Sequence, residues 1–352
     1  MNCHIVGSSW IRRVELLIGS GLLWCGCGGG QTPLLHVYTW SDYIAPEVVS
    51  RFESEQGCRI VFDYFDSNES LYAKVKAGAL GYDVIVPSSY MVRIMTEQKM
   101  LEPLDHGLLP NLANVDKAFS SLISDPEMKH SVPYMVGTTG IGYLKSRVSD
   151  FRPSWSMFAR SEYSQRMTLL NDMRETIGSA LKNLGHSLNT TDADQLKEAR
   201  DLIVSWKANI AKFESEQYKN GLVSGEFLLV QGYSGDIMQV MQENPDIAYA
   251  IPEEGTSVYV DELAIPAGAP NPALAHAFIN FLHDPGVAAR NTEAIYFLCP
   301  NSPSYDLLPE AIRDNPAIVI PRTILEKCEV VEDLGAENAK YVEAWDQIKA
   351  AE

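Results

Sequence analysis

Apolar runs alternate with amphipathic stretches between residues 34 and 87, and this alternation constrains the fold more than any other feature of the chain. A strand, helix, strand, helix and strand are predicted in turn, at 34–38, 46–57, 59–64, around Leu71 and Val75 up to Gly78, and at 82–87. Strands that alternate with helices form a parallel sheet with right-handed crossovers. In such sheets ligands bind beyond the carboxyl ends of the strands, here at 40–43 and 88–90.

The rest of the chain predicts further strands and helices in a less regular order. Strands are expected at 132–142, 227–233 and 258–265, and helices at 171–184, at 192–207, from Pro272 onward and from about Pro309 to the C-terminus. The strand at 132–142 looks like a segment that crosses between lobes, and a chain of 352 residues has room for two of them. The sequence therefore predicts an α/β protein of two lobes.

The N-terminus has the features of an export signal. A basic pair precedes an apolar run at 16–24, and two cysteines follow among glycines. The run is shorter than the roughly 20 residues that a membrane span needs. We expect a lipoprotein signal peptide at 1–26 and a lipid anchor with a flexible spacer at 27–33. Lipid is expected on Cys27, which follows a small glycine, or alternatively on Cys25; an ordinary cleaved signal that contains cysteines is the other reading.

The chain is strongly acidic. Its 46 Asp and Glu residues outnumber 28 Lys and Arg residues, which gives a formal net charge of -18. This balance argues against nucleic acid and against an anionic membrane surface as partners. It suits a cationic ligand, although acidity also serves solubility in secreted proteins.

The sequence lacks the motifs that indicate catalysis, a cofactor or a metal. Residues 231–235 come within one position of a nucleophile elbow, and no Walker loop, dinucleotide fingerprint, HExxH or paired CxxC occurs. Outside the leader, Cys58, Cys299 and Cys328 have no zinc spacing, and Cys299 with Cys328 is one possible disulfide. We therefore expect no enzyme, no cofactor and no metal, with a lipid-anchored hydrolase as a lesser alternative.

Acidic and aromatic side chains suggest a site for a cation. Asp172 and Glu175 lie three apart at a predicted helix start, where they could form a capping box, bind an ammonium group, or do both. Alternation places Tyr259 and Asp261 on one face of an apolar strand, where an aspartate is costly unless it is paired, and a structural salt bridge is the other reading. Aromatic faces attract cations and cover methylene chains. The predicted strand ends add Trp40, Asp42, Tyr43 and Tyr90.

These residues lie in segments that resemble the spermidine/putrescine-binding proteins of bacterial ABC importers. The segments are VYTWSDYIAP at 37–46, DSNESLYAK at 66–74, YDVIVPSSY at 82–90, LNDMRE at 170–175 and VDELAIPA at 260–267. The resemblance implies a two-lobed periplasmic-binding-protein fold of type II, in which each lobe has a mostly parallel sheet flanked by helices and the polyamine lies in the interlobe cleft. We expect the N-terminal lobe at 34–138 plus about 263–305 and the C-terminal lobe at 139–262 plus about 306–352.

The resemblance also implies ligand-binding roles. It assigns the ammonium groups to Asp172, Glu175 and Asp261. It assigns the walls and remaining contacts to Trp40, Ser41, Asp42, Tyr43, Ser89, Tyr90, Tyr233, Tyr259 and Phe297, with Ser88 in the same loop. The chain departs from the family where Ser41 and Asp42 replace Thr and Glu, Tyr233 and Tyr259 replace Trp, Phe297 replaces Tyr, and Val331 replaces Gln. These departures leave the preference between spermidine and putrescine open.

The resemblance completes the expected function. Together with the export signal, it predicts a monomeric polyamine receptor, lipid-anchored in the periplasm, that delivers putrescine or spermidine to the permease subunits of an ABC importer. The N-terminal lipid is the expected contact with the membrane, and no nucleic acid is expected. The alternatives are a receptor for another small cationic solute and a polyamine sensor that is not coupled to transport.

Overall fold

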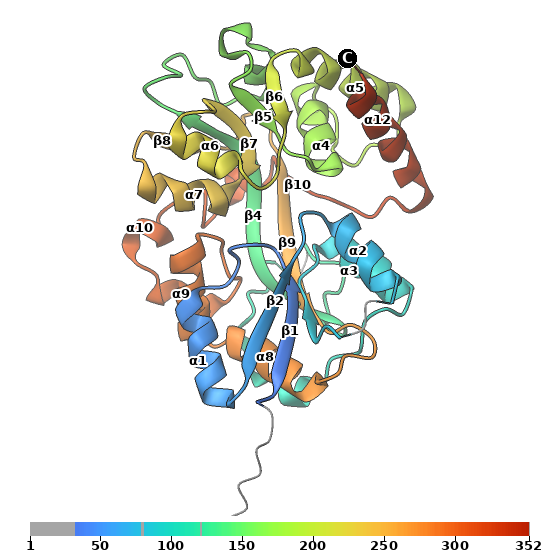
Figure 1. The fold of residues 1–352 in the computed structure, drawn as a ribbon, viewed down its shortest axis with the longest axis vertical. Helices are drawn as coiled ribbons and strands as arrows, with labels where there is room; N and C mark the ends of the chain where they lie inside the picture. The colour runs from blue at the N-terminus through green and yellow to red at the C-terminus, as the bar shows by residue number, and fades with distance from the viewer. Residues whose placement is uncertain (1–31, 79–80, 120–121, 352) are drawn as a thin grey trace, which may run out of the picture. The chain divides into compact units, whose positions relative to one another are not determined.

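The predicted alternation of strands and helices is confirmed in the computed structural model, which describes residues 32–78, 81–119 and 122–351 (Figure 1). The first elements are β1 (Leu34–Thr39), α1 (Pro46–Gln56), β2 (Arg59–Tyr64), α2 (Asn68–Lys76), β3 (Val84–Ile85) and α3 (Ser89–Glu97). Strand β1 pairs in parallel with β2 on one side and with β3 on the other. Helix α1 begins at Pro46 and ends at Gly57, whose left-handed φ of 60° suits a residue without a Cβ. Strand β3 is shorter than predicted.

Two long antiparallel strands connect the two ends of the sheet. They are β4 (Ser131–Leu144) and β9 (Ser257–Ala264), and they pair with each other over most of the length of β9. Strand β9 also pairs with β3, whereas β4 continues beyond β9 to pair with β7 (Leu229–Tyr233) and β8 (Ile247–Ala250). The strand predicted at 132–142 is therefore confirmed, and it joins both ends of the sheet.

The second end of the sheet is again mostly parallel. Strand β5 (Met167–Leu169) pairs in parallel with both β6 (Ile210–Phe213) and β7. The strand order through the described residues is β2-β1-β3-β9-β4-β7-β5-β6, with β8 beside β4 and β10 (Glu329–Val330) beside β9. A mostly parallel sheet at each end, joined by an antiparallel middle, is the predicted two-lobed α/β arrangement.

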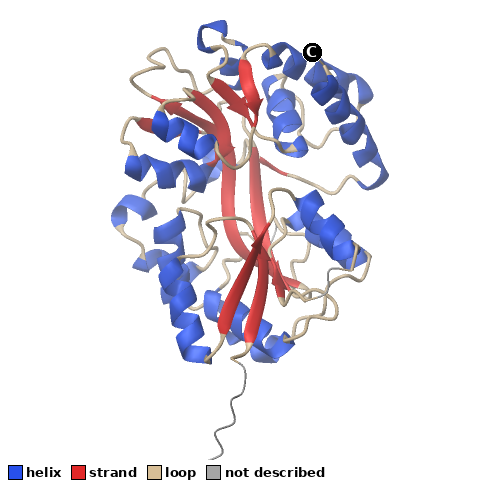
Figure 2. Cartoon of the chain, in the orientation of Figure 1, coloured by secondary structure: helices blue, strands red, loops and turns tan. Residues whose placement is uncertain are grey.

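Helices cover the sheet at both ends (Figure 2). After α3 they are α4 (Met173–Asn183), α5 (Ala193–Lys207), α6 (Tyr218–Ser224), α7 (Ser234–Glu243), α8 (Pro272–Leu282), α9 (Pro285–Ile295), α10 (Glu310–Arg313), α11 (Arg322–Leu325) and α12 (Asn338–Ala350). Short 3₁₀ turns cover His106–Leu108, Pro110–Asn114, Trp155–Ala159, Ser161–Tyr163, Ser302–Leu307 and Gly335–Glu337. The helices predicted at 171–184, at 192–207 and from Pro272 are confirmed as α4, α5 and α8.

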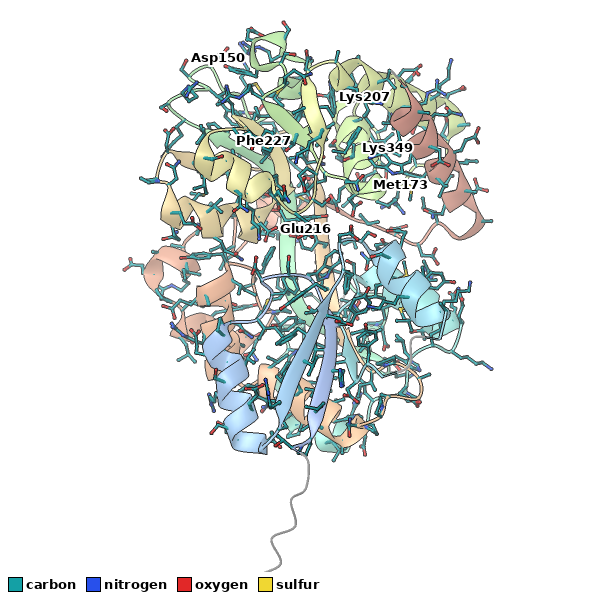
Figure 3. All side chains as sticks on the ribbon, in the orientation of Figure 1. Asp150, Met173, Lys207, Glu216, Phe227 and Lys349 are labelled. Atoms are coloured by element: carbon teal, nitrogen blue, oxygen red, sulfur yellow. The ribbon has the colours of Figure 1, made fainter. Side chains whose placement is uncertain are left out.

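Each end of the sheet has its own hydrophobic core. At one end, Trp155 and Trp206 are buried in the same hydrophobic cluster as Phe227, which Figure 3 labels. At the other end, Phe52 of α1 packs against Phe278 of α8, with ring centroids 4.9 Å apart. A third cluster, which includes Val136, Met238 and Leu298, joins the two ends.

The C-terminal part, predicted to be helical from about Pro309, contains a strand as well as helices. Within the described residues it is helical in three separate pieces, α10, α11 and α12, and between the last two β10 pairs with β9. Strand β10 forms because pairing with β9 satisfies backbone groups that would otherwise need partners inside a helix. The pairing of β10 with β9 brings Val330 and Val331 to the wall of the cavity that is described below.

The structure also answers the question of the cysteines. Cys58, Cys299 and Cys328 are free, so the possible disulfide between Cys299 and Cys328 is not formed. The two side chains belong to different hydrophobic clusters, which keeps them apart. Among the described residues, no helix combines the length and the apolar character that crossing a membrane requires. The predicted signal peptide and its two candidate lipidation sites, Cys25 and Cys27, lie outside the described residues.

Candidate ligand-binding site

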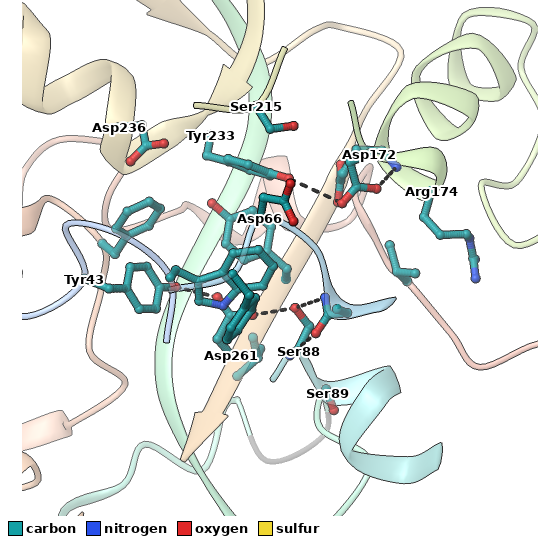
Figure 4. A pocket seen from close by; sticks show the side chains of 18 of the residues that line it. Tyr43, Asp66, Ser88, Ser89, Asp172, Arg174, Ser215, Tyr233, Asp236 and Asp261 are labelled. Carbon is teal, nitrogen blue, oxygen red and sulfur yellow. Dashed lines mark hydrogen bonds between the residues drawn. The ribbon is translucent and has the colours of Figure 1, made fainter. Parts of the chain in front are cut away.

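A cavity lies where the carboxyl ends of the parallel strands of both lobes face each other (Figure 4). It contains about 850 Å³ of empty space, part of which is open to solvent. Eleven of the twelve residues predicted to bind ligand line it: Trp40, Ser41, Tyr43, Ser89, Tyr90, Asp172, Glu175, Tyr233, Tyr259, Asp261 and Phe297. Ser88 lines it as well.

Asp42 is the predicted residue that the structure does not bring to the cavity. Its backbone has a left-handed φ of 53°, and 66% of its side chain is exposed. Its carboxylate accepts a hydrogen bond at 3.0 Å from Nζ of Lys219 on α6. Proximity to a strand end does not fix the direction of a side chain in a left-handed turn, so Asp42 lies outside the cavity lining.

Asp261 lies on β9 with its side chain in the cavity wall. It is 3% exposed, and its carboxylate accepts hydrogen bonds from the hydroxyls of Tyr43 at 2.5 Å and Ser88 at 2.6 Å. Burial nevertheless raises the pKa of Asp261 to about 6, because its donors are neutral. The structural salt bridge considered from the sequence is absent, since no Lys or Arg of the described residues forms an ion pair with Asp261.

Asp172 and Glu175 lie at the start of α4, where Asp172 is the N-cap. The Asp172 carboxylate accepts the backbone N–H of Glu175 at 3.0 Å, which is half of the predicted capping box. The Glu175 carboxylate turns instead to β9, where it accepts the hydroxyl of Ser257 at 2.5 Å. Burial raises the pKa of Asp172 and that of Glu175, and the neighbouring Asp172 carboxylate raises the pKa of Glu175 further.

Arg174 lines the cavity, and its charge opposes only part of the rise that burial causes in the pKa of Asp172 and Glu175. Its guanidinium donates to the backbone oxygen of Glu332 at 2.9 Å and to Asn189 Oδ1 at 2.8 Å, and it stacks over the ring of Tyr341. Figure 4 shows the Arg174 side chain directed away from the Asp172 carboxylate. Within the described residues, neither Asp172 nor any other carboxylate forms an ion pair with Arg174.

Aromatic rings form the walls between the carboxylates. Tyr259 on β9 makes an edge contact with Tyr233, with centroids 5.5 Å apart, and a tilted contact with Phe297 at 6.4 Å. Phe297 in turn contacts Tyr43 at 5.1 Å. Such rings cover methylene groups, and their faces attract cations by roughly 0.5 to 2 kcal/mol each.

Two glycines allow these rings to approach the backbone. A Cβ at Gly137 on β4 would lie 2.4 Å from the hydroxyl oxygen of Tyr259, and a Cβ at Gly235 would lie 2.5 Å from the ring of Phe297. Neither distance is compatible with a side chain, so both positions require glycine for the aromatic wall to form.

A second set of polar residues lines the cavity on the side of α6 and α7. Asp236 in the first turn of α7 accepts the hydroxyl of Tyr218 at 2.7 Å and forms an ion pair with Lys219 at 3.5 Å. Burial raises the pKa of Asp236, and the Lys219 ammonium opposes that effect. Glu216 nearby accepts the hydroxyl of Ser41 at 3.4 Å, which joins the loop after β1 to the segment before α6.

Sequence reasoning missed several residues of the cavity. They are Phe65, Asp66, Asn68, Arg174, Ser215, Glu216, Asp236, Val260 and Val330. The rule that found 40–43 would have found most of them, because 65–68 follow β2, 215–216 follow β6 and Asp236 follows β7. Val330 gave no such signal, since β10 was not predicted. Within the described residues, no group of three or more His, Cys, Asp or Glu has an arrangement that could hold a metal ion.

Comparisons with known proteins agree with this geometry. The profile of a family described as bacterial extracellular solute-binding protein matches residues 47–319. The putrescine-binding periplasmic protein of Pseudomonas aeruginosa is 35% identical over 337 residues, which cover 90% of this chain and 92% of that protein. The spermidine/putrescine-binding periplasmic protein of Escherichia coli is 31% identical, with 97% of this chain and 99% of that protein covered.

Solved structures show the same fold. A putative spermidine/putrescine ABC transporter from Listeria monocytogenes superposes with a TM-score of 0.86 at 33% identity, covering 91% of this chain and 100% of the other. A lipoprotein of Treponema pallidum superposes with a TM-score of 0.81 at 31% identity, covering 90% and 99%. The predicted type II periplasmic-binding-protein fold is therefore confirmed.

Proposed function

The chain belongs to the family of bacterial extracellular solute-binding proteins, and from this premise we propose that it is a periplasmic receptor that binds a polyamine and delivers it to an ABC importer. Its relatives are solute-binding proteins and not enzymes. Relatives that cover at least nine-tenths of the chain are named for putrescine or for spermidine and putrescine. Those names support a polyamine as ligand.

The observation that carries the proposal is the set of buried carboxylates without a protein cation. Asp172, Glu175 and Asp261 all have a pKa above its ordinary value, because burial removes water that would stabilise their charge. An unpaired buried charge is costly, and a cation with hydrogen-bond donors removes that cost. A ligand with ammonium groups supplies both the charge and the donors.

The aromatic wall explains why the ligand would be a chain with charges at its ends. The Tyr233 hydroxyl donates to the Asp172 carboxylate at 3.5 Å (Figure 4). Tyr259, two residues before Asp261 on β9, contacts both Tyr233 and Phe297. Their rings offer apolar surface to methylene groups and π faces to cations. A polyamine has both parts in this order, whereas a compact cation would leave the wall uncovered.

We propose that the lobes are those expected from the sequence, 34–138 plus about 263–305 and 139–262 plus about 306–352. Separate cores at the two ends of the sheet support this division, and β4 and β9 are the connections at which the lobes would rotate. Closure around the ligand would exclude water and strengthen each charged contact.

The anchor and the partners are part of the same proposal. The receptor would be exported, lipidated at Cys27 or Cys25, and held as a monomer beside the membrane by that lipid. The solved relative from Treponema pallidum is named as a lipoprotein, which supports an anchor of this type. Its partners would be the permease subunits of the importer.

Isothermal titration tests the ligand. The protein from residue 28 onward, unfolded and refolded to remove bound ligand, is titrated with putrescine, spermidine and spermine. We expect one-to-one binding of at least one polyamine and no binding of 1,4-butanediol, which has the length of putrescine without its charges. Absence of heat with all three polyamines would overturn the proposed ligand and favour another small cationic solute.

A further inference from the structure

The buried carboxylates of the cavity fall into two groups that differ in their partners. On the side of α4 and β9, Asp172, Glu175 and Asp261 accept hydrogen bonds from neutral donors alone among the described residues. On the side of α6 and α7, Asp236 already has a cation, the ammonium group of Lys219. One part of the site therefore needs cations from a ligand, and the other part contains its own.

Lys219 is held firmly in this position. Its side chain is 14% exposed, and its Nζ lies 3.5 Å from Asp236 Oδ1 and 3.0 Å from Asp42 Oδ2. Burial alone would lower the pKa of Lys219, but the Asp236 and Asp42 carboxylates outweigh it and raise the value, so the amine stays charged. A ligand ammonium group that approached Asp236 would find its carboxylate already paired with Lys219, and the positive charge of Lys219 would repel it.

The other acids on this side do not offer a buried alternative. The Asp42 side chain is 66% exposed and already accepts Lys219. Glu216 and Asp66 are exposed at the residue level. Burial raises the pKa of Glu216, and the charge of Lys219 opposes that effect. Lys219 is thus paired with Asp236, the acid on this side whose negative charge is destabilised most by burial.

The α4 side has room for two ammonium groups. Ser257, Tyr259 and Asp261 lie on one face of β9. Because the Ser257 hydroxyl donates to the Glu175 carboxylate, the position of Ser257 along the strand approximates that of this carboxylate. Ser257 and Asp261 are four residues apart, which is about 13 Å along a strand. A four-carbon diamine has five bonds of about 1.5 Å and spans about 6 Å when extended. A charged hydrogen bond of about 2.8 Å at each end brings the span to about 12 Å.

We propose that Lys219 acts as an internal third cation that makes the site selective for a diamine over a triamine. This inference rests on the proposed polyamine-binding function and specifies its ligand class. The two ends of the diamine pair with the carboxylates of α4 and with Asp261, and the methylene chain passes Tyr259. A triamine would have to place its third ammonium group against Lys219 or leave it without a buried carboxylate.

The test compares Lys219→Met with Lys219→Arg. Met keeps the length and apolar stem of lysine without its charge, whereas Arg keeps the charge, so the pair separates the cation from the packing. Putrescine and spermidine are titrated into each refolded protein, and the readout is the ratio of their dissociation constants. Thermal unfolding of each ligand-free variant shows that it is folded, and Lys219→Gln serves as a second neutral variant.

We expect the wild-type protein to bind putrescine about tenfold or more tightly than spermidine, because a third ammonium group finds no buried acceptor. Lys219→Met and Lys219→Gln should shift that ratio toward spermidine by about tenfold, since they leave Asp236 unpaired. Lys219→Arg should keep the wild-type preference. A purely structural Lys219 would weaken both ligands equally and leave the ratio unchanged.

Two results overturn this inference while the proposed function stands: a wild-type protein that prefers spermidine, or a ratio that the neutral variants leave within about twofold of the wild type. Absence of binding of either polyamine to the wild type overturns the proposed function and this inference together. The two failures are therefore distinguishable in one experiment.

Discussion

The α4 end of the cavity and its α6–α7 end are both acidic, but they are in opposite electrostatic states. At the α4 end, the half-buried Asp172 lies beside the buried Glu175, and both accept hydrogen bonds from neutral donors. At the α6–α7 end, the half-buried Asp236 pairs with the ammonium group of Lys219. Among the described residues, no ion pair reaches the acids of the first end, whereas the second end has one. The difference teaches that the partners of acidic residues, and not their number alone, distinguish the two ends.

The largest effect is expected for Asp261→Asn. Asn keeps the shape and can still accept from Tyr43 or Ser88, but it removes the carboxylate that we pair with one ammonium group. Breaking a buried ion pair costs about 3 to 5 kcal/mol, so affinity for the best polyamine should fall by about 100-fold or more in titration. The matched control is Glu262→Gln on the next residue of β9, whose buried carboxylate accepts Ser131 instead of facing the cavity. Equal losses in both variants would contradict the assignment.

Asp172→Asn separates the two roles of a residue that both caps α4 and faces the cavity. Asn is as good an N-cap as Asp, so the free energy of unfolding should change by less than about 1 kcal/mol. Polyamine affinity should fall by about 30-fold, less than for Asp261→Asn, because Glu175 remains beside it. Thermal unfolding and titration check the two parts. A large loss of stability with unchanged affinity would show that Asp172 is only a cap.

The pH dependence of binding should follow the unpaired end of the cavity. Burial raises the pKa of Asp261 from 3.8 to about 6, so at pH 5 the folded, ligand-free protein binds a proton there. The proton competes with the ligand, and between pH 8 and pH 5 this group alone should weaken polyamine binding about tenfold. Titrations at the two pH values, with Asp261→Asn as reference, measure its contribution.

Stability of the ligand-free protein should change in the opposite direction. An acid whose pKa is raised in the folded state destabilises that state at pH values above the folded pKa. As the pH falls from the folded pKa toward the unfolded pKa, this destabilisation disappears. Asp261 should therefore stabilise the fold by about 1.4 kcal/mol on going from pH 8 to pH 5, relative to Asp261→Asn. Denaturant unfolding of both proteins provides the measurement, and a wild-type protein that loses stability relative to the variant over this range would contradict the assignment.

The smallest effect is expected for Asp42→Asn. The Asp42 side chain is exposed and lies outside the cavity, so its half of the pair with Lys219 is a surface one, and Lys219 keeps Asp236 as a partner. Such pairs contribute about 0 to 1 kcal/mol, so putrescine affinity should change by less than about threefold. A loss as large as that of Asp172→Asn would mean that the two ends of the cavity do not differ as the structure indicates.

Local pattern was sufficient for much of the fold and for part of the site. The alternation at 34–87 predicted β1, α1, β2 and α2, and the strand-end rule then placed Trp40 and Tyr90 at a ligand cavity. Strand periodicity put Tyr259 and Asp261 on one face, which β9 confirms. The same rule applied to β6 and β7 would have found Glu216 and Asp236. By contrast, no local pattern predicted β10, because a two-residue strand forms only where another strand offers an edge.

The sequence by itself determined which segments become strands and helices, and therefore which acids and aromatic rings stand at the strand ends. Those features depend on neighbours within a few residues, which the chain displays directly. Only the tertiary structure decided which acids are already paired. Asp42 and Asp172 both follow a strand, but Lys219, which is 177 residues from Asp42, lies against one of them and no cation of the described residues lies against the other. The charge that a ligand must supply depends on contacts between distant segments, and these exist only once the chain has folded.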